Sequence, residues 1–98
     1  MKSTLLTSLT VAAALGLAVA AVPAAAQEAL AKSSGCLNCH AIDTKKMGPS
    51  FKDIAAKFKG KADAEATLTA QLMAGTGHPA VKAKPEDVKA LVKWVLAM

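Results

Sequence analysis

The chain has 98 residues, a formal net charge of +5 at pH 7, and only 3% aromatic residues. All of its basic residues are lysines, so it lacks both the arginines that contact base edges and the aromatic side chains on which bases stack. This composition excludes nucleic acid as a partner. The two cysteines are three positions apart, and a disulfide between them would close too small a loop to stabilise the chain.

Residues 1–26 are predicted to be a secretory signal peptide. An apolar run follows the basic residue Lys2, and Ala24-Ala25-Ala26 supplies the small residues that a signal peptidase reads. Cleavage before Gln27 would leave residues 27–98 as one small domain. The alternative is a retained membrane anchor, but the run is short and alanine-rich for a spanning helix. We therefore expect a periplasmic protein without stable membrane insertion after cleavage.

The first two helices of this domain are predicted from their ends and their apolar spacing. Residues 27–34 form the first helix, which has Leu30 as its main apolar residue and ends at Gly35. Ser50 is a candidate N-cap of the second helix, which ends before Gly60. The buried face of the second helix is formed by apolar residues at i, i+3, i+4 and i+7, namely Phe51, Ile54, Ala55 and Phe58.

Two further helices follow in the second half of the chain. Asp63 is a candidate N-cap for the third helix, and Gly75 is a natural residue to follow its last turn. Residues 76–84 form a loop, and Pro85 suits the first position of the last helix. The inner faces of these helices are formed by Ala64, Leu68 and Leu72, and by Val88, Leu91, Val92 and Val95 with Trp94 on the flank. No strand pattern is present in the sequence, so we predict an all-α domain of about four short helices.

The strongest signal is the segment Cys36-Leu37-Asn38-Cys39-His40. Two thiols at this spacing reach the two vinyl groups of one haem as thioethers, and the following histidine supplies an imidazole nitrogen to the iron. The segment therefore predicts haem c as a covalently bound cofactor, with Cys36 and Cys39 as attachment residues and His40 as the proximal metal ligand.

Two other interpretations fit these residues less well. A thioredoxin-like redox pair would need a sheet with βαβ units, which the sequence does not show. A zinc site would need four ligands, nominally Cys36, Cys39, His40 and His78, but the adjacent Cys39 and His40 suit one tetrahedral ion poorly.

The segments GCLNCHAIDTKKMGPSFKDIAAKFKGK (Gly35–Lys61) and LVKWVLAM (Leu91–Met98) resemble the short bacterial class I cytochromes c. The resemblance covers nearly all of residues 27–98. It implies an all-α fold around one haem c, with one edge exposed for electron transfer. It also implies that the Pro49 carbonyl accepts a hydrogen bond from Nδ1 of His40, which fixes the orientation of the imidazole.

The chain departs from this family at the place of the distal iron ligand. The family has an aromatic residue where this chain has Ala31, and a longer loop before the last helix that contains a tryptophan and a methionine. The corresponding loop here, residues 76–84, has neither, but it contains His78. We predict His78 as the distal ligand. Met73 at the end of the third helix is the alternative, Met47 is expected to be a packing residue, and Met98 a frayed terminus.

The function predicted from these features is that of a periplasmic carrier of single electrons. No catalytic triad, carboxylate pair or phosphate loop indicates an enzyme, so no catalytic residues are predicted. Lysines near the haem segment are expected to favour redox partner proteins with acidic docking patches: Lys45, Lys46, Lys52, Lys57, Lys59 and Lys61. The alternatives are a haem-based binder or sensor of small ligands, and a cytochrome subunit of a larger dehydrogenase.

Overall fold

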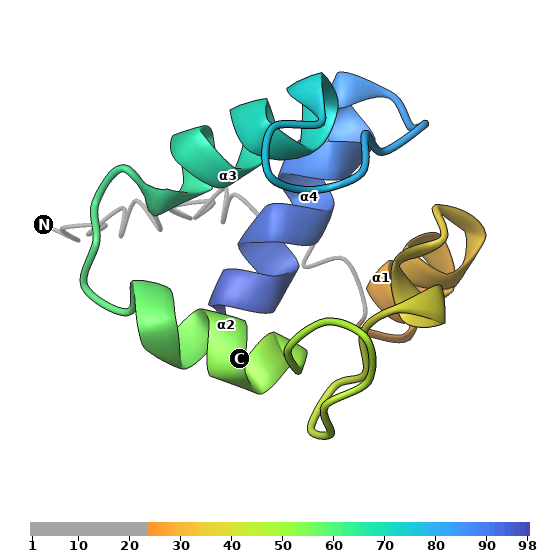
Figure 1. Cartoon of the computed structure of the whole chain (residues 1–98), viewed down its shortest axis with the longest axis horizontal. Helices are drawn as coiled ribbons and strands as arrows, with labels where there is room; N and C mark the ends of the chain where they lie inside the picture. Colours follow the sequence, from red (N-terminus) through yellow and green to blue (C-terminus); the bar gives the residue numbers. More distant parts are fainter. Residues whose placement is uncertain (1–23) are drawn as a thin grey trace, which may run out of the picture.

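The computed structural model describes residues 24–98, and these residues form four α-helices and one short 3₁₀ turn (Figure 1). The elements follow the order α1 (Ala24–Ser33), η1 (Cys36–Asn38), α2 (Phe51–Phe58), α3 (Ala64–Ala74) and α4 (Pro85–Leu96). No strand occurs within residues 24–98, so the predicted all-α fold is confirmed. None of the helices in this range is long and apolar enough to cross a membrane.

The first helix differs from its predicted bounds. Within the described residues it runs from Ala24, the first of them, to Ser33, so it includes the three alanines before residue 27, which have a high helix propensity. Its buried residue is Ala31, which is fully inaccessible, whereas Leu30 is only half-buried. Ala31 lies on the helix that packs against α4, where a small side chain allows close approach. Residues 1–23, which include most of the predicted signal peptide, lie outside the described part.

The ends of α2 and α3 illustrate two kinds of N-terminus. The hydroxyl of Ser50 accepts a hydrogen bond of 3.1 Å from the backbone N–H of Asp53, which confirms the predicted cap. Asp63 does precede α3, but its side chain makes no capping hydrogen bond, and this part of the prediction is wrong. The backbone of Asp63 has φ −94° and ψ 0°, instead of the extended conformation from which a capping side chain reaches the helix.

The last helix is the centre of the fold. It packs against α1, α2 and α3, and Pro85 occupies its first turn as predicted. Figure 1 shows α3 at the top and α2 at the bottom, with α4 running between them. The residues buried between helices are few and mostly small: Ala31, Phe51, Ala55, Ala64, Val88, Leu91 and Val92. Four other apolar side chains instead line a cavity between α2 and α3, namely Ile54, Phe58, Leu68 and Leu72.

Candidate functional site

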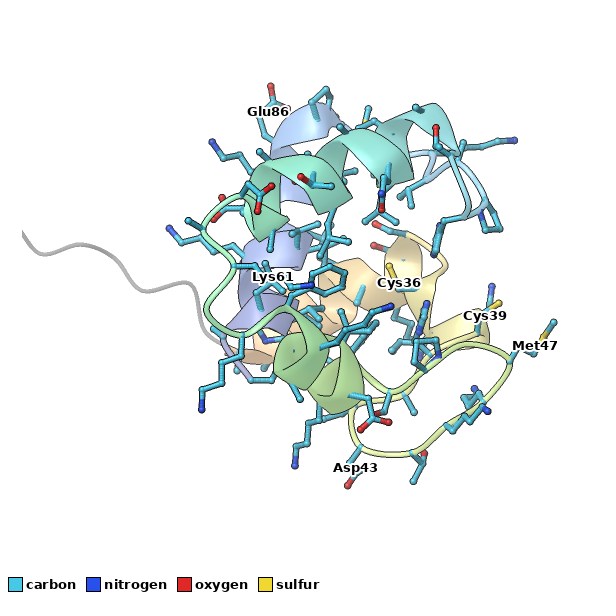
Figure 2. The ribbon with its side chains drawn as sticks, turned by 60° about the vertical axis from the view of Figure 1, so that its left-hand side comes forward. Cys36, Cys39, Asp43, Met47, Lys61 and Glu86 are labelled. Atoms are coloured by element: carbon cyan, nitrogen blue, oxygen red, sulfur yellow. The ribbon has the colours of Figure 1, made fainter. Side chains whose placement is uncertain are left out.

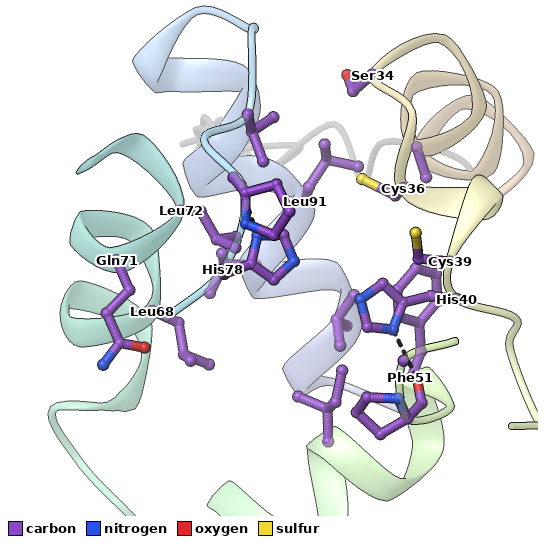
Figure 3. A pocket seen from close by; sticks show the side chains of 18 of the residues that line it. Ser34, Cys36, Cys39, His40, Phe51, Leu68, Gln71, Leu72, His78 and Leu91 are labelled. Carbon is purple, nitrogen blue, oxygen red and sulfur yellow. Dashed lines mark hydrogen bonds between the residues drawn. The ribbon is translucent and has the colours of Figure 1, made fainter. Parts of the chain in front are cut away.

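The segment with the two cysteines is a single tight turn that follows α1. Gly35 has a φ of +84°, a conformation that glycine adopts without strain, and it redirects the chain into η1. The backbone N–H of His40 then donates to the carbonyl of Cys36 over 3.0 Å. This turn places both thiols and the imidazole on the wall of one cavity, as Figure 3 shows.

The thiol of Cys36 is not an activated nucleophile. Burial raises its pKa, and this effect is only partly opposed by a backbone hydrogen bond. Redox-active Cys-x-x-Cys pairs have a lowered thiol pKa, so Cys36 does not match a thioredoxin-like site. Within residues 24–98, no three His, Cys, Asp or Glu side chains are grouped so that they could hold a metal ion between them. The nominal zinc site is therefore not formed.

His40 is held from three sides. Its Nδ1 lies 2.6 Å from the carbonyl oxygen of Pro49, and because a carbonyl can only accept, Nδ1 carries the proton and donates it. The ring of Phe51 stacks at a centroid distance of 5.4 Å and an angle of 25°. A Cβ atom on Gly48 would lie 2.5 Å from Cε1 of His40, so only glycine fits there. The contact with Pro49 confirms the one implied by the resemblance, and it leaves Nε2 as the free nitrogen.

His78 faces His40 across the cavity. The two imidazole rings are nearly parallel, with an interplanar angle of 4° and a centroid distance of 6.0 Å. Nδ1 of His78 lies 2.7 Å from the carbonyl oxygen of Pro79, so here too Nδ1 donates to a proline carbonyl and Nε2 remains free. The loop that carries His78 is fixed to α3 by a 2.9 Å hydrogen bond from the N–H of Val81 to the carbonyl of Leu72.

The methionines lie elsewhere. Met73 is 36% exposed, and it does not line the cavity. Met47 borders the cavity but is 86% exposed, so it is not the packing residue that was predicted, because the loop that carries it projects into solvent (Figure 2). Met98 is 38% exposed at the chain end.

The cavity itself has a volume of about 680 Å³ and lies between α2, α3 and α4. This volume is in the range of sites that enclose a whole organic ligand or cofactor. Its walls are mainly apolar, and their large apolar side chains include Phe51, Ile54, Phe58, Leu68, Leu72, Leu91, Val92, Trp94 and Val95. Trp94 also packs edge-on against Phe51 at a centroid distance of 5.6 Å. The apolar positions predicted as inner faces of the helices thus mostly face the cavity.

These residues fit a haem. A flat apolar macrocycle requires apolar walls, two thiols near its vinyl edge and an imidazole nitrogen directed at its centre. The cavity supplies the walls, Cys36 and Cys39 lie at one end of it, and His40 presents a free Nε2. Cys36 and Cys39 would hold the haem as thioethers, and bound haem would supply one iron that cycles between Fe(II) and Fe(III).

Two polar residues on the helices that form the cavity wall were not predicted to lie there. Lys57 of α2 and Gln71 of α3 both line the cavity. Each follows an apolar lining residue by three positions, Ile54 in one helix and Leu68 in the other. Residues at i and i+3 share a helix face. This spacing could therefore have indicated that both polar side chains line the cavity.

Comparisons with known proteins agree with this geometry. The sequence model of the family described as cytochrome c matches residues 24–98. Cytochrome c-551 of Pseudomonas aeruginosa is 43% identical over 77 residues, which cover 71% of this chain and 74% of that protein. Cytochrome c-551 of Stutzerimonas stutzeri is 40% identical over 94 residues, which cover 87% of this chain and 90% of that protein.

Solved structures show the same fold. The class 1 cytochrome MtoD of Sideroxydans lithotrophicus superposes with a TM-score of 0.70 at 39% identity, over 79% of this chain and 97% of that one. Cytochrome c552 of Nitrosomonas europaea superposes with a TM-score of 0.64 at 38% identity, over 70% of this chain and 95% of that one.

Proposed function

Because the chain belongs to the cytochrome c family, whose cofactor is haem c attached through a Cys-x-x-Cys-His segment, we propose that it carries single electrons in the periplasm through one haem. Members of this family are small electron-transfer proteins and not enzymes, in agreement with the absence of predicted catalytic residues. In the proposed assignment Cys36 and Cys39 form the thioethers, and His40 and His78 are the proximal and distal iron ligands.

The observation that carries this assignment is the relation between the two imidazoles. A metal–imidazole nitrogen bond is about 2 Å long and the ring centre lies about 1 Å further out, so two imidazoles on opposite sides of one metal have centres about 6 Å apart. The rings of His40 and His78 have centres 6.0 Å apart. Both rings also have Nδ1 engaged by a proline carbonyl, which leaves Nε2 of each for the metal.

Two imidazole ligands would define the redox behaviour of the site. With both axial positions of the iron filled by protein side chains, little rearrangement accompanies a change of oxidation state, which suits an electron carrier. A thioether ligand raises the potential of a haem, so the second imidazole should give a lower potential than that of relatives with His/Met ligation. The hydrogen bonds to Pro49 and Pro79 raise the basicity of both rings, which should lower the reduction potential further.

The proposed function is tested by a redox titration combined with carbon monoxide binding. The intact chain, matured with haem attached, should take up one electron per molecule reversibly and bind carbon monoxide slowly or not at all in the reduced form. His78→Ala should bind carbon monoxide rapidly, and Met73→Ala should behave as the wild type. Rapid binding by the wild type would favour a haem-based sensor over a carrier. A large partner that co-purifies with the chain would favour a dehydrogenase subunit.

The proposed location rests on residues 1–26 as a cleaved signal peptide. The A-x-A sequence before Gln27 supports cleavage after Ala26, and such a cut would remove the first three residues of α1 and leave the rest of this helix. The mass of the protein recovered from a periplasmic fraction tests this proposal. The expected species starts at Gln27 and carries one haem, whereas a full-length chain in the membrane fraction would contradict it.

The proposed partners are redox proteins with acidic docking patches. Six exposed lysines lie in the loop before α2, in α2 itself and directly after it: Lys45, Lys46, Lys52, Lys57, Lys59 and Lys61. Lys46 also makes a contact within the protein, because its ammonium group donates a hydrogen bond to the carbonyl of Leu37 over 3.0 Å. The combined positive field favours an acidic partner surface.

A further inference from the structure

Gln27 is a polar residue on the inner face of α1. It precedes Leu30 and Ala31 by three and four positions, so the three side chains share one face of the helix. Ala31 on this face is fully buried, and α1 packs against α4. The side-chain oxygen of Gln27 is buried too and accepts no hydrogen bond, and it is the one such side-chain atom among residues 24–98. This end of the Gln27 side chain therefore lies against the protein and not in water.

The three residues directly before Gln27 differ from it in their surroundings. Ala24, Ala25 and Ala26 are all exposed, so the proposed cleavage after Ala26 removes no buried side chain from this part of α1. The cut makes Gln27 the first residue of the chain and gives it a free α-amino group. The pKa of an ordinary α-amino group is close to neutral pH, so a fraction of this group is the neutral, nucleophilic amine and the rest is ammonium.

An ammonium group is unfavourable at this position of the fold. The amino end of a helix is the positive end of its dipole, where a cation is destabilising. Glu28 is the one acid in the first turn of the shortened helix. It is exposed, and an exposed ion pair offsets little of such a cost. A reaction that removes the charge of the Gln27 α-amine would therefore stabilise the start of α1.

We propose that Gln27 is a modification site and becomes pyroglutamate after cleavage. This inference rests on the proposed function, because it takes cleavage after Ala26 as its starting point. The neutral α-nitrogen of Gln27 attacks Cδ of the side-chain amide of the same residue. The new bond between this nitrogen and Cδ closes a five-membered lactam, and the bond between Cδ and Nε2 breaks. A proton passes from the α-nitrogen to Nε2, which leaves as ammonia, so the step needs no oxidant and no second substrate.

The lactam fits the start of α1 better than an open glutamine with a free amine. It carries no charge for the helix dipole to oppose. The first N–H groups of a helix have no partner within the helix, so closing the ring at the α-nitrogen breaks no helical hydrogen bond. Chain termini are where proteolysis concentrates, and aminopeptidases require a free α-amine. The modification would therefore also protect the mature chain from digestion at this end.

The experiment measures the mass of the haem-carrying protein from the periplasm and of its N-terminal fragments. Free amines are methylated as soon as the periplasm is released, so that a ring that closes later in vitro is not counted. Gln27→Asn is the matched control, because asparagine keeps the side-chain amide but is one carbon shorter and would need a strained four-membered ring. Gln71 is the internal control, because its α-nitrogen is already part of a peptide bond.

The expected wild-type chain begins at residue 27, is lighter by one ammonia than its sequence requires, and carries no methyl label on its α-nitrogen. The deficit lies in the fragments that contain Gln27, whereas Gln27→Asn has its full mass and a labelled α-nitrogen. A wild-type chain that begins at Gln27 with a labelled α-amine, or an equal deficit in Gln27→Asn, would overturn this inference and leave the proposed function intact. A chain that begins at another residue would overturn the proposed cleavage site together with the inference.

Discussion

The imidazole rings of His40 and His78 lie parallel within 4°, on opposite sides of the cavity and 6.0 Å apart. His40 comes from the turn after α1, and His78 comes from the loop between α3 and α4. Their relative orientation is set by two separate hydrogen bonds, from each Nδ1 to a proline carbonyl.

This parallel arrangement predicts the electron paramagnetic resonance spectrum of the oxidised haem protein. Low-spin ferric haem with two parallel imidazole planes gives a rhombic spectrum with three resolved features. Perpendicular planes give a single feature at large g. We expect the rhombic spectrum, recorded on the frozen oxidised protein, and a dominant large-g feature would show that the two planes are not parallel in the haem-bound protein.

Gly48 is predicted to be required for the position of His40. A Cβ atom at residue 48 would lie 2.5 Å from Cε1 and 2.9 Å from Nδ1 of that ring, so Gly48→Ala must displace the imidazole and weaken its bond to Pro49. We expect a loss of about 1–3 kcal/mol in the free energy of unfolding, the usual cost of overpacking, measured by denaturant titration. The control is Gly60→Asn, because a Cβ at residue 60 meets nothing within 4 Å and asparagine tolerates positive φ. Equal losses in both variants would contradict the steric argument.

Ser50 and Asp63 form a matched pair, since each precedes a helix but only Ser50 caps it. The hydroxyl of Ser50 is buried and accepts from the N–H of Asp53, so Ser50→Ala should lower the free energy of unfolding by about 1 kcal/mol. Asp63→Ala removes no capping hydrogen bond and should cost only a few tenths of a kcal/mol. Thermal or urea unfolding of both variants, monitored by circular dichroism, checks the difference. A larger loss for Asp63→Ala would reverse the assignment of the caps.

The exposed lysines predict a salt dependence of electron transfer. Attraction between a positive surface and an acidic partner is screened when ionic strength rises, because the Debye length falls to about 8 Å near 0.15 M. The bimolecular rate constant with an acidic redox protein should therefore decrease steadily with added salt, as measured by stopped-flow spectroscopy. A basic redox protein of similar potential is the control and should show the opposite trend. A rate constant that does not change with salt would remove the docking proposal.

Much of the fold could be predicted from local signals. Features that depend on a few neighbouring residues can be predicted from the sequence. They include the cap at Ser50, the proline at the start of α4 and the apolar spacing along α2 and α4. Asp63 shows the limit, because a capping residue type was present but its backbone conformation is set by the connection between α2 and α3. The helical conformation of residues 24–26 was not predicted, because the same alanines also mark the cleavage site.

The site was predictable in its chemistry and less so in its geometry. The spacing of Cys36, Cys39 and His40 names the cofactor, and the absence of methionine from the loop before α4 draws attention to His78. The parallel orientation of the two rings depends on how that loop is fixed to α3, which is a tertiary contact. The sequence places Lys57 with the surface lysines, because its position at the cavity wall depends on the placement of α2 relative to α3 and α4.

The most direct test of the proposed ligand pair is the absorption spectrum of the oxidised wild-type protein in the red region. A methionine thioether bound to ferric haem gives a charge-transfer band there, and a second imidazole does not. With His40 and His78 as the two ligands, the wild type should show no such band. The His78→Ala variant should give the spectrum of a high-spin haem, and the Met73→Ala variant should give the wild-type spectrum. A thioether band in the wild type, lost in Met73→Ala and retained in His78→Ala, would contradict the account.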